Sequence, residues 1–204
     1  MLEVINLACA RGDRNLFEGL NFALRPGELL HILGANGSGK TTLLRTLCGL
    51  TRPADGVIRW QGSTIRELGD DYRAELAYVG HTNALQGELT PAENLRAAAG
   101  LGAAASEHDI ERALERFNLS ALRSFPAKVL SQGQKRRLGL ARLALLRRRL
   151  WIMDEPFAAL DTHSIALVTE LLAGHLAQGG LVALTSHQEF DIGNLEFLSI
   201  RLGP

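Results

Sequence analysis

The sequence has little cysteine and no long apolar run. Cys9 and Cys48 are its only cysteines in 204 residues, so we expect two small, buried, free thiols rather than a disulfide or a metal site. No apolar run reaches the ~20 residues that span a bilayer. Met1–Ala10 carries Glu3 and lacks a basic segment ahead of an apolar one. It is therefore not typical of a signal peptide, and we expect the chain to stay in the cytosol.

The sequence also lacks an excess of either charge. It has 22 basic and 22 acidic residues, for a net charge of +0. Nucleic-acid-binding proteins usually carry a basic excess, so this balance argues against a nucleic-acid partner. Hydrophobic residues make up 46% of the chain, which is enough for a buried core and argues against disorder. The length suits a single domain over residues 1–204, with a small subdomain attached.

Strand-like and helix-like segments alternate, which predicts an α/β fold with a largely parallel sheet. The early strands are separated by turn residues and are predicted to form a small antiparallel sheet. From about residue 84 to 149 the pattern is almost entirely helical, which predicts a helical insert. One predicted helix begins at Thr90-Pro91, and two further helices cover Ser106–Phe117 and Ser131–Arg149. The predicted strands are Glu3–Ala8, Leu16–Leu24, Leu29–Leu33, Val57–Trp60, Leu76–Val79, Leu150–Met153, Leu181–Thr185 and Phe197–Arg201.

A glycine-rich segment between a predicted strand and the helical stretch Thr42–Leu50 matches the P-loop pattern G-x-x-x-x-G-K-[ST] in full. Its backbone N–H groups and the helix N-terminus favour phosphate, and a chance match in a glycine-rich turn is rare. Lys40 is predicted to reach the β- and γ-phosphates, and Thr41 to place its hydroxyl on Mg²⁺. We predict ATP contacts from Gly34, Ala35, Asn36, Gly37, Ser38, Gly39, Lys40, Thr41 and Thr42.

Two further strand ends carry polar residues that suit phosphate chemistry. Asp154 and Glu155 follow the apolar strand Leu150–Met153. Asp154 is predicted to hold Mg²⁺ beside Thr41, and Glu155 to polarise the attacking water. A solvated turn is the alternative, but the upstream P-loop favours function. His187 follows another apolar strand, where ligands gather in α/β sheets, so we predict contact with the γ-phosphate rather than a structural role.

The segment Leu130–Gln134 opens the long predicted helix. Ser131 is a residue type that caps helices, and Gly133 leaves bare backbone near the helix N-terminus, which makes a second anion-binding surface. Alone, this segment would be an ordinary helix start. The basic runs Lys135–Arg137 and Arg147–Arg149 are typical of a solvated helix face, with a membrane-surface role as the alternative.

Taken together, these motifs resemble the nucleotide-binding subunits of ABC transporters over essentially the whole chain. Gly34–Thr41 is similar to the Walker A motif, Leu130–Gln134 to the signature, Leu150–Glu155 to Walker B, Ala159–Asp161 to the D-loop and His187 to the H-loop. The resemblance implies a P-loop NTPase with a RecA-like core, an N-terminal antiparallel β subdomain and a helical subdomain at about residues 84–149.

This resemblance also implies how the chain works. Two copies would sandwich two ATP molecules head to tail, and integral membrane subunits would move when ATP is hydrolysed. Each ATP would touch the P-loop of one copy and Ser131, Gly133 and Gln134 of the other. Soluble ABC-type factors that act on DNA or ribosomes carry a long coiled-coil insert or two fused ATPase halves, and neither is found in this sequence. A P-loop kinase would leave Leu130–Gln134 and His187 without a role.

Two positions depart from the family pattern. Where most members stack an aromatic residue on adenine, this chain has Arg11, which could stack its guanidinium plane or remain a solvated loop charge. Where most members have a glutamine after the strand that reads Ala77-Tyr78-Val79, it has His81, a candidate bridge from Mg²⁺ or water to the helical insert.

A narrower resemblance, to the ATP-binding subunits of cytochrome c maturation (haem exporter) systems, rests on short strings. These are Val57–Gly62, Tyr78–His81 and Glu88–Thr90. It implies a peripheral position on the cytoplasmic face of a bacterial inner membrane, and ATP use for haem export or for release of a haem-loaded chaperone. The chain shows no haem ligand set, so direct haem ligation is not expected. An ABC transporter with another cargo is the alternative.

Overall fold

The computed structural model describes residues 1–12, 14–100, 105–187, 190 and 197–203. The N-terminal part forms a four-stranded antiparallel sheet in the order β2-β1-β4-β5, as the closely spaced early strands predicted. Its strands are β1 (Leu2–Arg11), β2 (Arg14–Leu24), β4 (Asp55–Trp60) and β5 (Ser63–Thr64).

A second sheet of five strands, all parallel, forms the centre of the molecule in the order β6-β7-β8-β3-β9. Every residue of β7 and β8 is buried, as expected for parallel strands that helices or sheets cover on both faces. The predicted bounds of β6, β7 and β8 are confirmed. The strands are β3 (Leu29–Gly34), β6 (Leu76–Val79), β7 (Leu150–Met153), β8 (Leu181–Thr185) and β9 (Phe197–Leu202).

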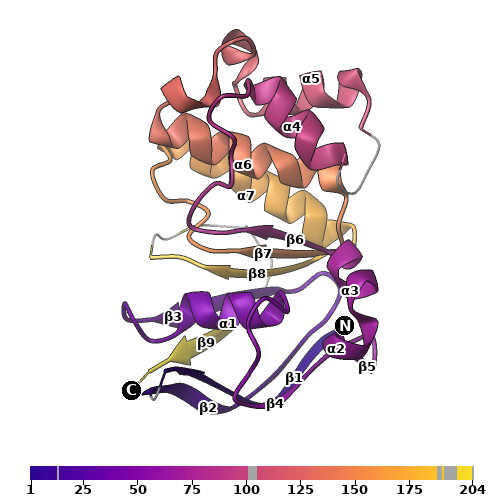
Figure 1. The fold of residues 1–204 in the computed structure, drawn as a ribbon, viewed down its shortest axis with the longest axis vertical. Coiled ribbons are helices and arrows are strands. Elements are labelled where there is room, and N and C mark those ends of the chain that lie inside the picture. Colours follow the sequence, from indigo (N-terminus) through magenta and orange to yellow (C-terminus); the bar gives the residue numbers. More distant parts are fainter. Residues whose placement is uncertain (13, 101–104, 188–189, 191–196, 204) are drawn as a thin grey trace.

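The elements stack in layers (Figure 1). Helix α1 (Lys40–Leu47) lies between the two sheets, and α6 (Gln132–Leu146) and α7 (Thr162–Ala177) cover the opposite face of the parallel sheet. Beyond them lie α4 (Pro91–Gly100) and α5 (Glu107–Arg116), which pack against α6. The short helices α2 (Ile65–Leu68) and α3 (Asp70–Glu75) follow β5.

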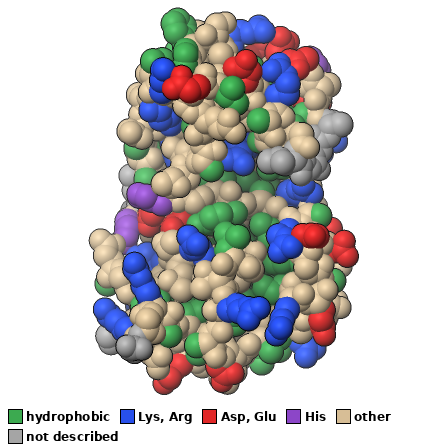
Figure 2. Space-filling model, viewed as in Figure 1, with side chains coloured by type: hydrophobic (Ala, Val, Ile, Leu, Met, Phe, Trp, Pro, Cys, Tyr) green, Lys and Arg blue, Asp and Glu red, His purple; other side chains and the backbone are tan. Residues whose placement is uncertain are grey.

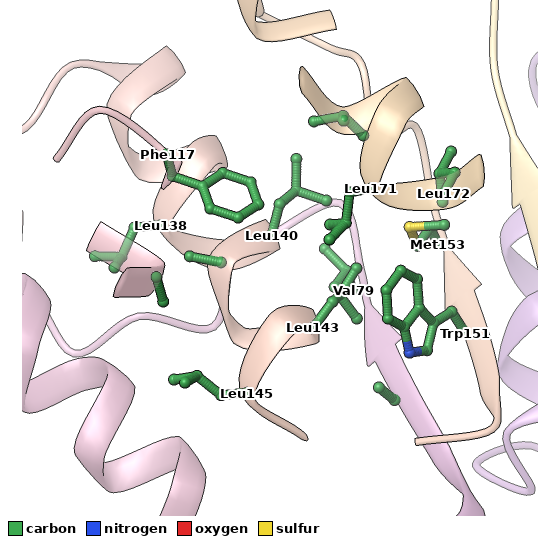
Figure 3. Packing of buried hydrophobic residues seen from close by; sticks show 14 of the residues in the cluster. Val79, Phe117, Leu138, Leu140, Leu143, Leu145, Trp151, Met153, Leu171 and Leu172 are labelled. Atoms are coloured by element: carbon green, nitrogen blue, oxygen red, sulfur yellow. The ribbon is translucent and has the colours of Figure 1, made fainter. Parts of the chain in front are cut away.

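Alternate residues of the parallel strands face two separate cores. Leu30, Ile32 and Ile152 face α1 and the antiparallel sheet. Trp151 and Met153 face the helical side, where they meet residues of α6 and α7 such as Leu143 and Leu172 (Figure 3). Because α6 packs on the sheet as well as on α4 and α5, it connects the helical insert to the strand ends that carry the site residues.

The helical insert is less continuous than predicted. No helix covers residues 84–90, and residues 118–131 hold only two short 3-10 turns, at Ser120–Leu122 and Ala127–Val129. Asn118 has a positive φ of 53°, and Pro126 lacks the N–H that a helix interior needs. Helix α6 stops at Leu146 rather than Arg149 because Arg147 has a left-handed backbone. Helices α2, α3 and α7 were not predicted.

Among the described residues, no helix combines the length and the apolar character needed to cross a membrane. On the face seen in Figure 2, Lys and Arg side chains are interspersed with Asp and Glu rather than gathered in one basic patch. Cys9 and Cys48 are buried and free, as predicted.

Candidate functional site

The P-loop joins the end of β3 to the start of α1, and close contacts require two of its glycines, Gly34 and Gly39. A Cβ on Gly34, which has a φ of +149°, would lie 2.5 Å from Ser38 Oγ and 2.6 Å from the carbonyl oxygen of Leu202. A Cβ on Gly39 would lie 3.1 Å from Leu16 Cβ. Gly37, in contrast, has no atom within 4 Å of such a Cβ. The loop is therefore packed on its inner side and open where backbone can approach a ligand.

The side chains of the P-loop direct a cation and a hydroxyl into the loop. Lys40, only 9% exposed, donates from Nζ to the carbonyl oxygens of Gly34 at 2.6 Å and Ala35 at 3.2 Å. Ser38 Oγ is buried and finds no hydrogen-bond partner among the described residues. A buried polar atom without a partner is costly. Phosphate oxygens would give Ser38 an acceptor and Lys40 a counter-charge, so these residues fit a nucleotide.

Two threonines hold Asp154 at the end of β7. Thr41 Oγ1 donates to Asp154 Oδ2 at 2.7 Å, and Thr185 Oγ1 donates to Asp154 Oδ1 at 2.8 Å. Asp154 is only 3% exposed. Since β7 and β8 are neighbours in the parallel sheet, their carboxyl ends bring these groups together. Thr185 was not predicted as a site residue, although its position at the end of a core strand was a usable signal.

A hydroxyl beside a carboxylate suits Mg²⁺, which binds through one or two carboxylates, water and substrate phosphates. Thr41 and Asp154 are therefore a fitting donor pair. In the part of the chain that the structure describes, no three His, Cys, Asp or Glu side chains form a metal-binding group.

Glu155 and His187, which follow the neighbouring strands β7 and β8, lie together. The backbone N–H of His187 donates to Glu155 Oε2 at 3.1 Å, and His187 Nε2 lies 3.5 Å from Glu155 Oε1. The Glu155 side chain is 19% exposed and that of His187 is 56% exposed. Glu155 also donates its backbone N–H to Thr185 Oγ1 at 2.9 Å. Thr185 thus fixes the backbone of Glu155 and His187 orients its carboxylate. Oε1 is buried without a hydrogen-bond partner among the described residues, so a water bound there would give it a donor.

A second histidine near Glu155 was missed from the sequence. His31 lies in the middle of β3, half-buried, with Nε2 3.4 Å from the carbonyl oxygen of Ser186. Burial lowers the pKa of His31, whereas the Ser186 carbonyl and the charge of Glu155 oppose that shift. Its ring also meets Phe190 and Phe197 edge-on, with centroids 5.2 and 6.0 Å apart. A histidine inside an apolar strand carries no signal in the sequence that distinguishes it from a core residue.

The signature segment forms a complete capping box at the start of α6. Gln134 donates its backbone N–H to Ser131 Oγ at 3.2 Å, and Ser131 donates its backbone N–H to Gln134 Oε1 at 2.8 Å. Ser131 is exposed. A Cβ on Gly133 would lie 2.8 Å from the carbonyl oxygen of Ala159, so glycine is needed here for close packing on the segment after Glu155.

The roles of Arg11 at adenine and of His81 at Mg²⁺ or water stay predictions. Arg11 ends β1, is exposed and pairs in register with Arg14. Its hairpin lies beside the P-loop, since Leu16 Cβ is within 3.1 Å of the Cβ position of Gly39. His81 is exposed after β6 and lines an open hollow of about 600 Å³ with Lys128 and Gln132, among others.

The prediction of a solvated basic run at Lys135–Arg137 is wrong for its central residue. Arg136 is only 4% exposed, and its guanidinium group donates to the carbonyl oxygens of Asp154 at 2.6 Å and Glu155 at 2.7 Å. Burial lowers the pKa of Arg136, and the carboxylates of Asp154 and Glu155 oppose that shift. The run is interrupted because α6 turns Arg136 toward the strand ends and leaves Lys135 nearer to solvent.

Comparison with known proteins agrees with this geometry. Residues 17–158 match the family model described as ABC transporter. The chain is 50% identical to the cytochrome c biogenesis ATP-binding export protein CcmA of Dechloromonas aromatica, over 100% of both chains. It is 48% identical to the CcmA of Nitrosospira multiformis, over 98% of both.

A solved structure, described as an ATP-binding subunit of an ABC transporter, superimposes with a TM-score of 0.82 and 32% identity, covering 92% of this chain and 79% of that one. The likeness confirms the predicted P-loop NTPase fold, with its antiparallel β part and helical part. The chain therefore belongs to the ABC transporter family and, within it, to the family of cytochrome c biogenesis ATP-binding export proteins.

Proposed function

We propose that this chain is the ATPase subunit of an ABC transporter for c-type cytochrome biogenesis. It would hydrolyse ATP to energise haem export or the release of a haem-loaded chaperone. The observation that carries the proposal is the chain of hydrogen bonds from Thr41 through Asp154 and Thr185 to the backbone N–H of Glu155, which links the P-loop to the backbone of the proposed catalytic residue. The full-length similarity to cytochrome c biogenesis ATP-binding export proteins supports the biological setting.

In this proposal the P-loop residues 34–42 bind the phosphates of ATP. Lys40 neutralises the β- and γ-phosphates. Thr41 and Asp154 hold Mg²⁺, with His81 as a further candidate. When bound, Mg²⁺ neutralises charge on the phosphates during transfer. Glu155 accepts a proton from the attacking water, and His187, held 3.5 Å from that carboxylate, orients the γ-phosphate.

The proposal includes a second copy of the chain arranged head to tail. Ser131 is exposed, and with Gln134 it forms a preformed turn at the positive end of α6. That helix end suits a phosphate group. In the dimer, Ser131, Gly133 and Gln134 of one copy would meet the ATP held by the P-loop of the other. Arg11 would lie against adenine.

The membrane assignment follows from the same proposal. Integral membrane subunits would bind this chain at the cytoplasmic face of a bacterial inner membrane and convert closure of the dimer into work on the cargo. Names of the relatives as export proteins support this arrangement.

A gene replacement tests the biological role. We expect a strain without this gene to lose its haem-stained c-type cytochromes and the wild-type gene to restore them. A Lys40→Ala gene should fail, because Lys40 Nζ is the cation inside the P-loop. A Lys128→Ala gene is the matched control, since the ammonium group of Lys128 pairs with Glu88 at an exposed position away from the P-loop. Normal c-type cytochromes in the deletion strain would contradict the assignment to cytochrome c biogenesis.

A pull-down from detergent-solubilised membranes tests the partners. The tagged chain should bring down integral membrane proteins, and loss of those proteins should release it into the supernatant fraction. Recovery of the tagged chain only as a dimer without membrane protein would contradict its role as a transporter subunit.

A further inference from the structure

The guanidinium group of Arg136 joins three segments that are distant in the sequence. From α6, Nη2 donates to the carbonyl oxygens of Asp154 and Glu155, and Nε donates to the carbonyl oxygen of Pro156 at 3.2 Å. Nη1 donates to the carbonyl oxygen of Gly80 at 2.8 Å and to Asn83 Oδ1 at 3.0 Å. An arginine has five N–H donors, so each donor of this side chain has an acceptor.

This arrangement depends on the planar fork of arginine. Three of the five acceptors are consecutive carbonyl groups around Glu155, and the other two belong to the loop that carries His81. A lysine at this position would offer three donors on one atom. It could not reach both the carbonyl groups around Glu155 and the acceptors in the loop that carries His81. Because the side chain is buried, loss of these bonds would take donors away from buried carbonyl groups, which is unfavourable. The carbonyl oxygen of Glu155 would keep the backbone N–H of Ala158 at 3.1 Å.

Two glycines let α6 approach the same segments closely. A Cβ on Gly133 would meet the carbonyl oxygen of Ala159 at 2.8 Å, and a Cβ on Gly139 would meet Asn83 Oδ1 at 3.3 Å. One face of α6 is thus fixed to the segment after β7 and to the loop after β6. Because these contacts are close and Arg136 bonds to the carbonyl oxygens of Asp154 and Glu155, a shift of this helix would also move the backbone around Glu155.

Ser131 caps the helix that carries Arg136. Five residues of α-helix span ~7.5 Å and behave as one rigid body over that length. A ligand that binds at Ser131 therefore acts on the same rigid helix segment that carries Arg136. The guanidinium group of Arg136 in turn holds the backbone of Glu155.

We propose that Arg136 is a positioning residue that couples Ser131 to Glu155 of the same chain. The proposal rests on the head-to-tail dimer proposed above. In that dimer, Ser131 belongs to the partner's ATP site and Glu155 to the chain's own, so Arg136 links the two sites. Occupancy of one ATP site then sets the position of the base in the other.

Single substitutions give the first test on the full-length chain. Arg136→Lys should bind ATP with an affinity within about twofold of wild type, while kcat falls by about tenfold or more because the base is misplaced. The steepness of turnover against ATP concentration should also fall. Arg137→Lys, one residue along α6, is the matched control, since the hydrogen bond of Arg137 goes to Ser164 Oγ on α7, at 3.4 Å, and not to the backbone around Glu155. Retained kcat and steepness in Arg136→Lys would overturn the proposal.

Mixed dimers separate coupling from a merely structural effect. One copy carries Glu155→Gln, so turnover comes only from the other, active copy. Ser131→Ala is then placed in the active copy, where Ser131 faces only the silent site. We expect this change to slow the active site by several-fold when Arg136 is present, and to have no further effect when the active copy also carries Arg136→Lys.

Two outcomes would overturn the proposal. The first is an active site that ignores Ser131→Ala. The second is equal slowing by Ser131→Ala with and without Arg136→Lys, which would indicate a weakened dimer rather than coupling through Arg136. A failure of the proposed function appears differently, because the parent dimer with one Glu155→Gln copy would then show no turnover that depends on association.

Discussion

At the scale of residues, the candidate chemistry depends on how a few polar side chains are held at the strand ends. Asp154 receives hydrogen bonds from Thr41 and Thr185, so both carboxylate oxygens are oriented. Glu155 lies next in sequence, but its positive φ of 51° turns its carboxylate toward His187. Adjacent carboxylates thereby gain different surroundings and different proposed roles, one at the metal and one at the attacking water.

The clearest prediction at this scale concerns Glu155→Gln. The amide cannot accept the proton from water, so turnover should fall by roughly 100-fold or more. ATP binding should persist, because the P-loop and Asp154 are unchanged, and the dimer should accumulate with ATP bound. Steady-state phosphate release and size-exclusion chromatography measure the two effects. Glu170→Gln on α7 is the control, and wild-type turnover in Glu155→Gln would contradict the assignment of the base.

At the scale of elements, α6 connects the signature segment to the strand ends. Its N-terminal turn carries Ser131, its next turn buries Arg136, and its apolar face packs on α4, α5 and the sheet. The sequence predicted this helix, its first residues and the buried strands β7 and β8. Their signals are local: a residue type that caps helices, apolar runs and motif spacing.

The features that the sequence did not predict depend on contacts between distant segments. Arg136 resembles a solvated charge in the sequence because its five acceptors lie 18 to 56 residues away. Thr185 gains its role only from the pairing of β8 with β7. Helix α7 is apolar on several sides, since it lies against the core, and therefore shows no clear amphipathic period. For Arg136 and α7, local residue patterns therefore give no signal, whereas for Thr185 the end of a core strand was the one signal available.

Gly133→Ala tests the close contact at the start of α6. Alanine favours a helix over glycine by about 0.5–1 kcal/mol. The added methyl would nevertheless meet the carbonyl oxygen of Ala159 at 2.8 Å, so we expect severalfold lower ATPase activity and no gain in thermal stability. The same change at Gly174 on α7, where nothing lies within 4 Å, should raise the unfolding temperature and leave activity unchanged. Equal behaviour of the two variants would contradict this account.

A pH-dependent contribution to stability comes from α7. His175 stacks on Trp151 with ring centroids 3.7 Å apart and an interplanar angle of 4°. Burial lowers the pKa of His175 below its ordinary value of 6.5. The folded chain thus keeps this ring neutral, whereas the unfolded chain takes up a proton below about pH 6.5. The free energy of unfolding should therefore fall as the pH drops from about 7.5 to about 5.5.

Chemical denaturation at several pH values measures this slope. His175→Gln should reduce the slope, and the remainder should come in part from His31, whose pKa burial also lowers. Substitution of His108, which is exposed on α5, serves as the control and should keep the wild-type slope. An unchanged slope in His175→Gln would refute the contribution of His175.

At the scale of the whole molecule, the two cores give each end a separate role. The antiparallel sheet and α1 support the P-loop, whereas α4 to α7 support the signature segment. Ser131 and Gln134 hydrogen-bond to each other at an exposed helix start. A complete ATP site in this account therefore needs a second copy, with the P-loop contributed by one chain and the signature segment by the other.

Mixing two inactive variants tests this central claim most directly. A Ser131→Arg chain keeps its P-loop, and a Lys40→Ala chain keeps its signature segment. In a mixed dimer, one of the two sites would combine the intact halves. ATP hydrolysis by the equimolar mixture should clearly exceed the mean of the two variants measured alone. A mixture that hydrolyses ATP no faster than that mean would contradict a site shared between two chains.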